Sequence, residues 1–334
     1  MGGQPFISVI VPAYNARKHL DACLDALLAS PYRSREIIVV DDSSTDGTAE
    51  IARAKGVAVH RTSNRSGPAA ARNCGALHAA GEILFFIDAD VQVRKETLGL
   101  VAERFIEGPE IDALFGSYDS DPYESGFLSQ YKNLSHHFVH QQSREEAGTF
   151  WAGCGAIRKE VFQRAGGFDP DRYPEPSIED IELGYRLKSI GGRILLDKTL
   201  QVKHLKRWTL AGLLHADIFR RAFPWAMLML QKGEIPSDLN LQFRSKASAC
   251  LVGLLILLLA LAPFVKQSLY GVLALLVLLA LLNLPFCRFM FQKRGPAFAA
   301  AAFFMHLLYY FYSGLAFVLC WARNALSGKE RARS

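Results

Sequence analysis

The pattern of apolar and polar residues changes near residue 245. Before that point, short apolar runs alternate with stretches whose apolar residues recur at helical spacing. The runs predict strands at residues 6–12, 36–40, 57–60 and 83–87. The stretches between them predict helices at residues 19–28, around residue 51 and at residues 69–80. This alternation predicts a parallel sheet with right-handed crossovers and with helices on both faces.

After residue 245 the chain is dominated by Leu, Ala and Phe. Three apolar stretches, at residues 247–265, 268–286 and 296–321, are each long enough to span a bilayer. The preceding residues 208–230 have a Trp-bearing apolar side beside Arg, which predicts a helix at a membrane interface or one packed on the domain before it. We therefore expect an α/β domain at 1–207, an amphipathic linker at 208–245, two to three transmembrane helices at 246–322 and a basic tail at 323–334.

The charge distribution supports a membrane partner. The net charge is +6, and many basic residues lie between Lys198 and Lys246, directly before the apolar region. Such a position favours an anionic membrane surface over nucleic acid. Basic residues before the first apolar stretch and after the second place the N-terminal domain in the cytoplasm, in a multi-pass protein. A third full span would carry the basic tail outside, against the positive-inside rule, so the third stretch is either an exception or a re-entrant or interfacial segment.

Polar clusters follow three of the predicted strands. Asp88 and Asp90 end the run at 83–87, Asp41 and Asp42 end the second strand, and Pro12 to Asn15 follow the first. In a parallel sheet the carboxyl ends of the strands share one edge, where ligands bind. Two carboxylates one residue apart at a strand end suit Mg²⁺ or Mn²⁺, although an acidic turn in solvent would have the same sequence.

Two nucleotide-binding classes lose support because their glycine-rich motifs are absent. The sequence has no GxGxxG turn after the first strand and no GxxxxGK[ST] run. Phosphates would therefore be held by a metal ion and basic side chains. A nucleotidyltransferase would also use two metal-binding carboxylates, but it should carry a Gly-rich basic loop where this chain has Pro12 to Asn15.

The middle of the chain offers fewer signals. Residues 127–142 predict a helix with three histidines, which favours a polar helix face over a metal site because no partner carboxylate is near. Glu179 and Asp180 open a predicted helix at 181–190, where capping also accounts for acidic residues. Short strands are expected at 193–196 and 202–204, with a further one near 114–117.

Five ordered motifs resemble those of a known family. They are SVIVPAYN (8–15), EIIVVDDSSTDGT (36–48), GPAAARNCGALHAAGEILFFIDAD (67–90), GGFD (166–169) and SIEDIELGYRLKSIGGRI (177–194). Over residues 6–207 the chain resembles the family 2 glycosyltransferases, inverting enzymes of the GT-A fold, with some resemblance to the dolichyl/polyprenyl-phosphate sugar transferases. The resemblance implies a mixed, mainly parallel sheet with helices on both faces, as the catalytic domain.

The resemblance also implies roles for individual residues. The donor nucleotide would be bound by Pro12, Tyr14, Asp41 or Asp42, Arg72 and Asp88. The metal ligands would be Asp88, Asp90, Gln92 and, more loosely, His204. Asp180 matches the general base, and Trp151 and Glu179 would lie on the acceptor side.

The implied reaction moves a sugar from a nucleotide-sugar donor to an acceptor hydroxyl or phosphate. The membrane segments suggest a lipid or lipid-linked acceptor at the cytoplasmic face. An enzyme that extends a polysaccharide is the alternative, although the QxxRW motif of processive synthases is missing and residues 220–225 are only a loose echo of it. A sugar nucleotidyltransferase, or a membrane scaffold or transporter with a degenerate enzyme domain, is a more distant alternative.

Overall fold

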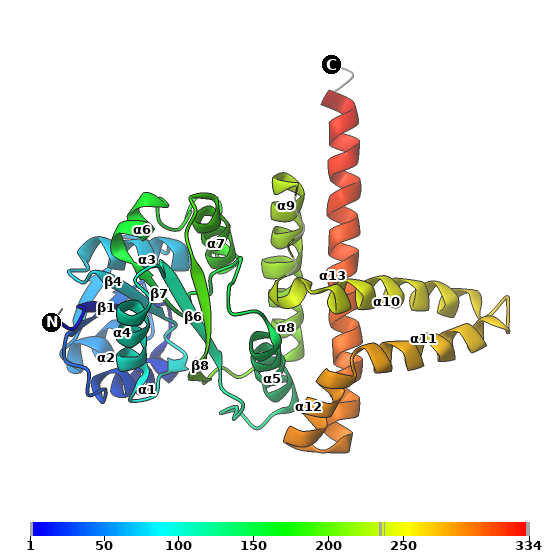
Figure 1. Cartoon of the computed structure of the whole chain (residues 1–334), viewed down its shortest axis with the longest axis horizontal. Helices are drawn as coiled ribbons and strands as arrows, with labels where there is room; N and C mark the ends of the chain where they lie inside the picture. Colours follow the sequence, from blue (N-terminus) through cyan, green and yellow to red (C-terminus); the bar gives the residue numbers. More distant parts are fainter. Residues whose placement is uncertain (1–2, 234–235, 237, 332–334) are drawn as a thin grey trace. The chain divides into compact units, whose positions relative to one another are not determined.

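The computed structural model describes residues 3–233, 236 and 238–331, and the chain forms two compact units, Met1–Trp208 and Thr209–Ser334. Figure 1 shows the course of the chain through both units. Residues 234, 235 and 237 of the expected linker and 332–334 of the expected basic tail lie outside the described residues. The two units are described separately.

The first unit is built on a mixed sheet. Within the described residues the sheet has eight strands in the order β3-β2-β1-β4-β7-β6-β8-β5. Their bounds are β1 Ile7–Ala13, β2 Arg35–Asp41, β3 Ala58–Arg61, β4 Ile83–Ile87, β5 Val91–Gln92, β6 Ala113–Tyr118, β7 Cys154–Arg158 and β8 Ile194–His204. Strands β3, β2, β1 and β4 run parallel, as do β6 and β8, whereas β7 and β5 are antiparallel to their neighbours. The predicted mixed, mainly parallel sheet is confirmed.

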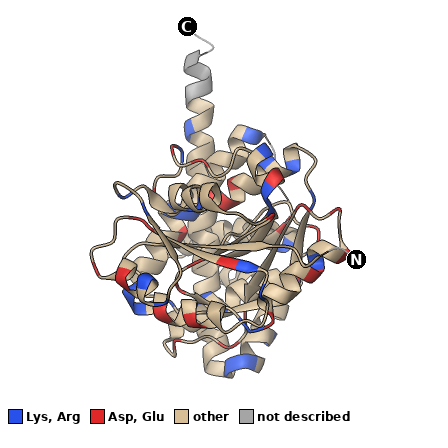
Figure 2. Ribbon diagram, turned by 90° about the vertical axis from the view of Figure 1, so that its left-hand side faces the viewer, with Lys and Arg blue, Asp and Glu red and all other residues tan. Residues whose placement is uncertain are grey.

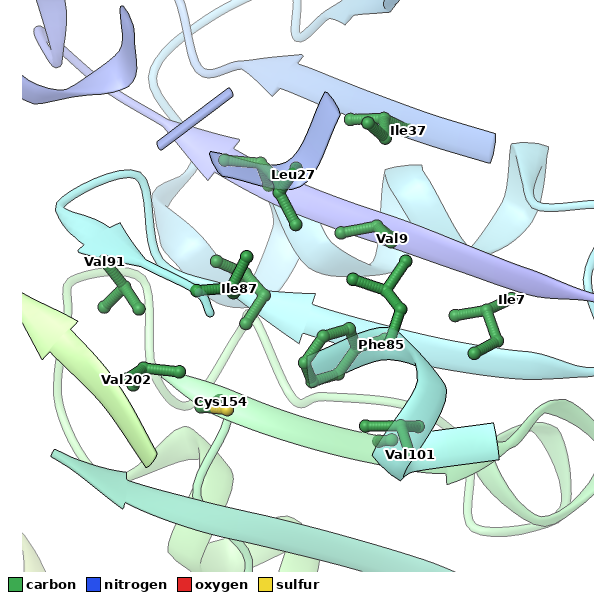
Figure 3. Close-up of a cluster of buried hydrophobic side chains, with 14 of the residues drawn as sticks. Ile7, Val9, Leu27, Ile37, Phe85, Ile87, Val91, Val101, Cys154 and Val202 are labelled. Atoms are coloured by element: carbon green, nitrogen blue, oxygen red, sulfur yellow. The ribbon is translucent and has the colours of Figure 1, made fainter. Parts of the chain in front are cut away.

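Helices cover both faces of this sheet. They are α1 Arg17–Leu28, α2 Thr48–Ala54, α3 Gly67–His78, α4 Thr97–Glu107, α5 Phe127–Gln142, α6 Lys159–Arg164 and α7 Glu179–Ser189. On one face, Leu27 of α1 and Val101 of α4 join Val9, Phe85 and Ile87 of the sheet in one buried cluster (Figure 3). On the other face, Gly75 of α3 lies against Ile10, and Phe162 of α6 packs on Phe86 with ring centroids 5.5 Å apart. Charged residues lie mostly on the helices and loops around the sheet (Figure 2).

Strand β8 is longer than the sequence predicts. It is continuous over 11 residues, whereas the pattern predicted pieces at 193–196 and 202–204. Asp197, Lys198 and Thr199 interrupt the apolar pattern between those pieces. The pairing with β6 continues across them because the register shifts between Phe115 and Ser117, an irregularity that lets the strand pass the polar residues.

The histidines of α5 lie on a face of the helix that packs on the sheet. His137 and His140 are buried. His137 Nδ1 donates to the carbonyl of Tyr118 at 2.8 Å, and His140 Nδ1 donates to that of Gly116 at 3.0 Å. Because burial disfavours the charged ring, the pKa of His140 is lowered to about 4. These histidines attach α5 to β6.

The second unit is helical. Its elements are α8 Leu210–Asp217, a π-helical turn Ile218–Ala222, α9 Phe223–Lys232, a 3₁₀ turn Leu239–Leu241, α10 Phe243–Leu261, α11 Ser268–Leu282, α12 Leu284–Arg294 and α13 Pro296–Arg331. In the described part, α10 and α13 are long and apolar enough to cross a membrane. Helices α11 and α12 would do so only as a pair bent by 70°, so the second apolar stretch is interrupted at Asn283.

Apolar exposure and a buried polar junction distinguish the second unit. Leu257 and Leu273 of the α10–α11 hairpin are more than 60% exposed, as expected for side chains that face lipid. The buried junction of α10, α11 and α13 is polar instead. Tyr310 donates to Asn283 Oδ1 at 2.8 Å, and Asn283 Nδ2 donates to Ser248 Oγ at 3.0 Å.

Candidate active site

The strand ends of the first unit bring the predicted polar clusters to one edge. Strands β1, β2 and β4 are parallel neighbours, with Ala13 opposite Asp41. Their carboxyl ends therefore point the same way, and Asp88 follows the end of β4. All five residues of β4 are buried, as the unbroken apolar run predicts.

Arg72 of α3 lies between two carboxylates at this edge. Its Nη2 donates to Asp88 Oδ1 at 2.7 Å, and its Nη1 donates to Glu179 Oε1 at 2.8 Å. Burial alone would lower the pKa of Arg72, but Asp88, Glu179 and Asp180 outweigh burial and raise it. This buried cation connects α3, the end of β4 and the start of α7. Its Nε is buried without a hydrogen bond among the described residues.

Asp180 lies in the first turn of α7 and is partly buried. Its Oδ2 accepts a hydrogen bond from the amide of Ala152 at 3.1 Å, and its Oδ1 accepts one from the amide of Ile181 at 2.8 Å. Burial and the adjacent charge of Glu179 raise the pKa of Asp180 to about 7, against the opposing effects of Arg72 and these amides. A carboxylate that titrates near neutral pH is suited to act as a general base.

Glu179 is engaged in a different way. Its Oε1 accepts from Arg72, and its Oε2 accepts from the amide of Ser177 at 2.9 Å. Because both oxygens already have partners, a contact between Glu179 and an acceptor would replace one of these bonds. In the structure, Glu179 therefore holds Arg72 and the start of α7 in place. Its role on the acceptor side stays a prediction.

The approach of α3 to the segment before α7 needs a glycine. Gly67 has φ +82°, and a side chain there would collide with the carbonyl of Pro174. The start of the helix that carries Arg72 thus touches the segment that leads to Asp180. Only glycine combines this backbone conformation with so close an approach.

A second cluster surrounds Asp90. His204 Nε2 lies 3.6 Å from Asp90 Oδ2, and the amide of Leu205 donates to the carbonyl of Asp90 at 2.8 Å. Burial alone would raise the pKa of Asp90, but His204, Lys206 and His19 outweigh burial and lower it to about 2. Asp90 therefore stays ionised across the physiological pH range.

An aromatic wall borders this cluster. The ring of Tyr118 stacks on His204 with centroids 4.2 Å apart and planes at 10°. Trp151 meets Tyr118 edge-on at 4.9 Å and lies 4.6 Å from the ring of His136. The structure thus places Trp151 beside the ring that orients His204.

The predicted metal ligands fit a divalent cation in their chemistry. Asp88 and Asp90 offer carboxylate oxygens and His204 an imidazole nitrogen, while Gln92 lies on β5 opposite Lys203. Asp88 already has one oxygen on Arg72. Within the residues that the structure describes, no three His, Cys, Asp or Glu side chains form a complete cation site. Donor phosphate oxygens commonly complete a Mg²⁺ shell that has only one or two protein carboxylates.

Asp42 holds the loop before α3. Its Oδ1 accepts from Thr62 Oγ1 and from the amide of Ser66, each at 2.8 Å. Its Oδ2 accepts from the amide of Gly67, also at 2.8 Å. The carboxylate of Asp42 is therefore committed to the structure of this loop.

Asp41 retains acceptor capacity. Its Oδ1 accepts from the amide of Ser44 at 3.1 Å, and its Oδ2 lies 3.4 Å from Arg61 Nε. Among the described residues, that second oxygen has no hydrogen bond. Because Asp41 is fully buried, its contact with a nucleotide stays a prediction.

Tyr14 follows β1 and is exposed at the carboxyl-end edge of the sheet. Its ring is exposed and lies 4.6 Å under the guanidinium of Arg65, and Arg65 also pairs with Glu175 at 2.6 Å. Pro12 is partly buried beside it in the sequence. An aromatic face with a cation above it can stack a planar ligand such as a nucleobase.

Sequence reasoning missed several residues of this site. Tyr118, Arg65 and His19 were not predicted, although Tyr118 ends β6, whose direction matches that of β4. An aromatic residue at the end of a strand was therefore an available signal for Tyr118. Arg65 and His19 lie in a loop and a helix that have no such signal.

Comparison with known proteins identifies the domain. Residues 8–166 match the family described as Glycosyl transferase family 2. Glycosyltransferase GlyG of Streptococcus pneumoniae is 35% identical over 117 residues, which cover 34% of this chain and 38% of that protein. The chain thus spans well under two thirds of this relative's length.

Solved structures share the fold. A mannosyltransferase of Pyrobaculum calidifontis, PcManGT in complex with GDP-Man and Mn²⁺, matches with a TM-score of 0.66 and 21% identity over 95% of this chain and 88% of that one. S. aureus TarS 1-349 in complex with UDP-GlcNAc matches with a TM-score of 0.52 and 19% identity over 96% of this chain and 92% of that one. Residues 8–166 therefore form a glycosyl transferase family 2 domain, and the chain shares its GT-A-like fold with these solved structures.

Proposed function

We propose that this protein is a membrane-anchored, inverting glycosyltransferase. It moves a sugar from a nucleotide-sugar donor to a lipid or lipid-linked acceptor at the cytoplasmic face of the membrane, with Mg²⁺ or Mn²⁺ as its cofactor. The domains proposed for this activity are the catalytic region 1–207, the linker 208–245 and the membrane region 246–322. The observation that carries the proposal is the difference between two carboxylates. The pKa of Asp180 is raised to about 7, which suits a base, whereas the pKa of Asp90 is lowered to about 2, which suits a metal ligand.

Asp180 is proposed as the general base. With a pKa of about 7, its carboxylate can accept the proton of the acceptor hydroxyl as that oxygen attacks the anomeric carbon. The new glycosidic bond forms as the bond to the diphosphate breaks, and the electron pair leaves with the diphosphate. The amide of Ala152 holds the carboxylate in place during this step.

Asp88, Asp90 and His204 are proposed to hold the cation, with Gln92 as a further ligand. When bound, the cation supplies positive charge against the leaving diphosphate. Arg72 contributes a second positive charge from its buried position beside Asp88. Asp41, Tyr14 and Pro12 are proposed to bind the nucleoside, and Trp151 to border the acceptor.

The solved relatives support a nucleotide-sugar donor. PcManGT is described with GDP-Man and Mn²⁺, and TarS with UDP-GlcNAc. TarS of Staphylococcus aureus is named a poly(ribitol-phosphate) beta-N-acetylglucosaminyltransferase, which favours a polymer acceptor as the second candidate. The apolar helices of this chain favour the lipid acceptor.

The test is a transfer assay on membranes that contain the full chain. Labelled nucleotide sugars are supplied singly with Mg²⁺ or Mn²⁺, and label is measured in the organic extract, in water-soluble polymer and as free sugar. We expect label in the organic extract, its loss with a chelator and its loss in Asp180→Asn. The exposed Asp171→Asn is the matched control and should retain transfer.

Label confined to polymer would favour the second candidate. Label found only as free sugar, or transfer that survives Asp180→Asn unchanged, would contradict the proposed reaction.

A further inference from the structure

Helix α13 has the length and apolar composition of a membrane span, as has α10. Its neighbours within the second unit, however, carry charge. The contacts of α13 with these neighbours therefore indicate how deep in a membrane it can lie.

Helix α9 and the π-helical turn before it contact α13, and α9 lies beside the C-terminal half of α13 (Figure 1). Tyr312, near the middle of α13, donates to Asp217 Oδ2 at 2.8 Å, and Arg221 Nη1 lies 3.6 Å from Asp217 Oδ1. Further along, Cys320 Sγ lies 3.8 Å from the carbonyl oxygen of Phe223. If α13 crossed the bilayer, Asp217 and Arg221 would lie near the centre of the hydrocarbon, where charged side chains are disfavoured.

The contacts of α13 with the α10–α11 hairpin also indicate the depth of α13 in the membrane. Tyr310 donates to Asn283 at the end of α11, and Asn283 donates to Ser248 near the start of α10. Ser248 follows Lys246 and Arg244 by two and four residues, or roughly 3–6 Å along the helix axis. Figure 1 shows α13 crossing the hairpin near this base. The middle of α13 therefore lies at the level where basic side chains mark the entry of the hairpin into the membrane.

The outer side of α13 has an exposed apolar stripe, which consists of Phe304, Phe311, Leu315 and Val318. Their spacing places them on one side of the helix, and they are between 37% and 64% exposed. The basic residues Arg288, Lys293 and Arg294 of α12 directly precede α13. An apolar side next to clustered basic residues fits the surface of an anionic bilayer.

We infer that α13 lies along the cytoplasmic surface of the membrane with its apolar stripe sunk into the lipid, and that the α10–α11 hairpin alone crosses. This inference rests on the proposed membrane anchoring. It keeps Arg323 and the basic residues that follow it in the sequence on the same side as Arg244 and Lys246, in agreement with the positive-inside rule.

The test uses the full chain with one specific protease site inserted at each of three places. The sites lie between Lys266 and Gln267 at the hairpin tip, between Gly295 and Pro296 before α13, and after Ser334. Protease is added to intact spheroplasts and, in parallel, to detergent-opened ones, which show that every site can be cut. We expect cleavage of intact spheroplasts at the hairpin tip only.

Two results would overturn the inference and leave the anchoring proposal standing. Cleavage of intact spheroplasts after Ser334, with the site at Gly295 protected, would show that α13 crosses. Protection of the hairpin tip would show that the hairpin does not cross. Release of the whole protein by an alkaline carbonate wash would instead contradict the membrane anchoring itself, and the inference with it.

Discussion

One buried polar cluster from each unit can be compared, because one cluster is charged and the other is neutral. In the first unit, the guanidinium of Arg72 lies between the carboxylates of Asp88 and Glu179. In the second, the junction of α10, α11 and α13 is held by one amide and two hydroxyls, those of Asn283, Ser248 and Tyr310. A buried charge needs an opposite charge, whereas neutral groups need only a hydrogen bond. The charged cluster is therefore the part expected to be sensitive to single substitutions and to pH.

The largest expected effect is on turnover. Asp180→Asn removes the proposed base, so we expect kcat to fall by about 10²–10⁴-fold with donor binding nearly unchanged. Steady-state kinetics and donor titration would measure the two quantities separately. A loss of donor affinity with kcat preserved at saturation would contradict the assignment, and Asp171→Asn controls for the change of charge.

The next largest effect is expected on stability, when Arg72→Met removes the cation of the charged cluster. Removal of the guanidinium leaves the buried Glu179 and the partly exposed Asp88 without their partner. The uncompensated buried charge should reduce the free energy of unfolding by about 3–5 kcal/mol. Arg65→Met removes an exposed pair with Glu175, whose side chains are 46% and 51% exposed, and should cost at most about 1 kcal/mol. Denaturant unfolding of the full chain in mild detergent measures both. Equal losses would show that burial does not distinguish the two pairs.

The pH dependence of kcat tests whether Asp180 is the base. Its pKa is raised to about 7, so the carboxylate becomes protonated and inactive as a base below that pH. We expect kcat to fall by about tenfold between pH 8 and pH 6. Because the folded state binds this proton more tightly than the unfolded chain does, Asp180 also makes stability decrease as pH rises from about 4 to 7. Residual activity of Asp180→Asn should lack the acidic limb, and a limb that persists would belong to another group.

The smallest expected effect is at the neutral junction. Tyr310→Phe removes the donor to Asn283 Oδ1 and should destabilise the second unit by about 0.6–2 kcal/mol. Tyr270→Phe, at a position that is 78% exposed, is the matched control and should have no measurable effect. The amount of SDS needed to unfold the purified chain reports the difference. A loss as large as that of Arg72→Met would remove the contrast between the charged and the neutral cluster.

Local sequence patterns predicted six of the eight described strands, all but β5 and β7, and the sheet edge at which the polar clusters meet. The apolar run at 83–87 was sufficient to predict β4, because a strand buried on both faces has an unbroken apolar sequence. Helix α4 was not predicted, and β8 was predicted as two pieces because polar residues interrupt its middle.

The side-chain partnerships could not be predicted from local patterns. Arg72, Asp88 and Glu179 meet only because α3, β4 and α7 end at one edge, and up to 107 residues separate them in the sequence. The burial of His137 and His140 likewise depends on how α5 packs on β6. In both cases the pattern gave the residue types, and the tertiary fold decided their partners.

The three hydrogen bonds that Asp42 accepts have a consequence for how phosphate is bound. Two of the donors are the amides of Ser66 and Gly67, at the N-terminus of α3. A helix N-terminus carries partial positive charge and often binds phosphate through such amides. Here a built-in carboxylate already occupies that position and neutralises it. A diphosphate at this sheet edge would therefore find no free helix dipole at α3, and its charge would have to be balanced by side-chain cations and a bound metal ion.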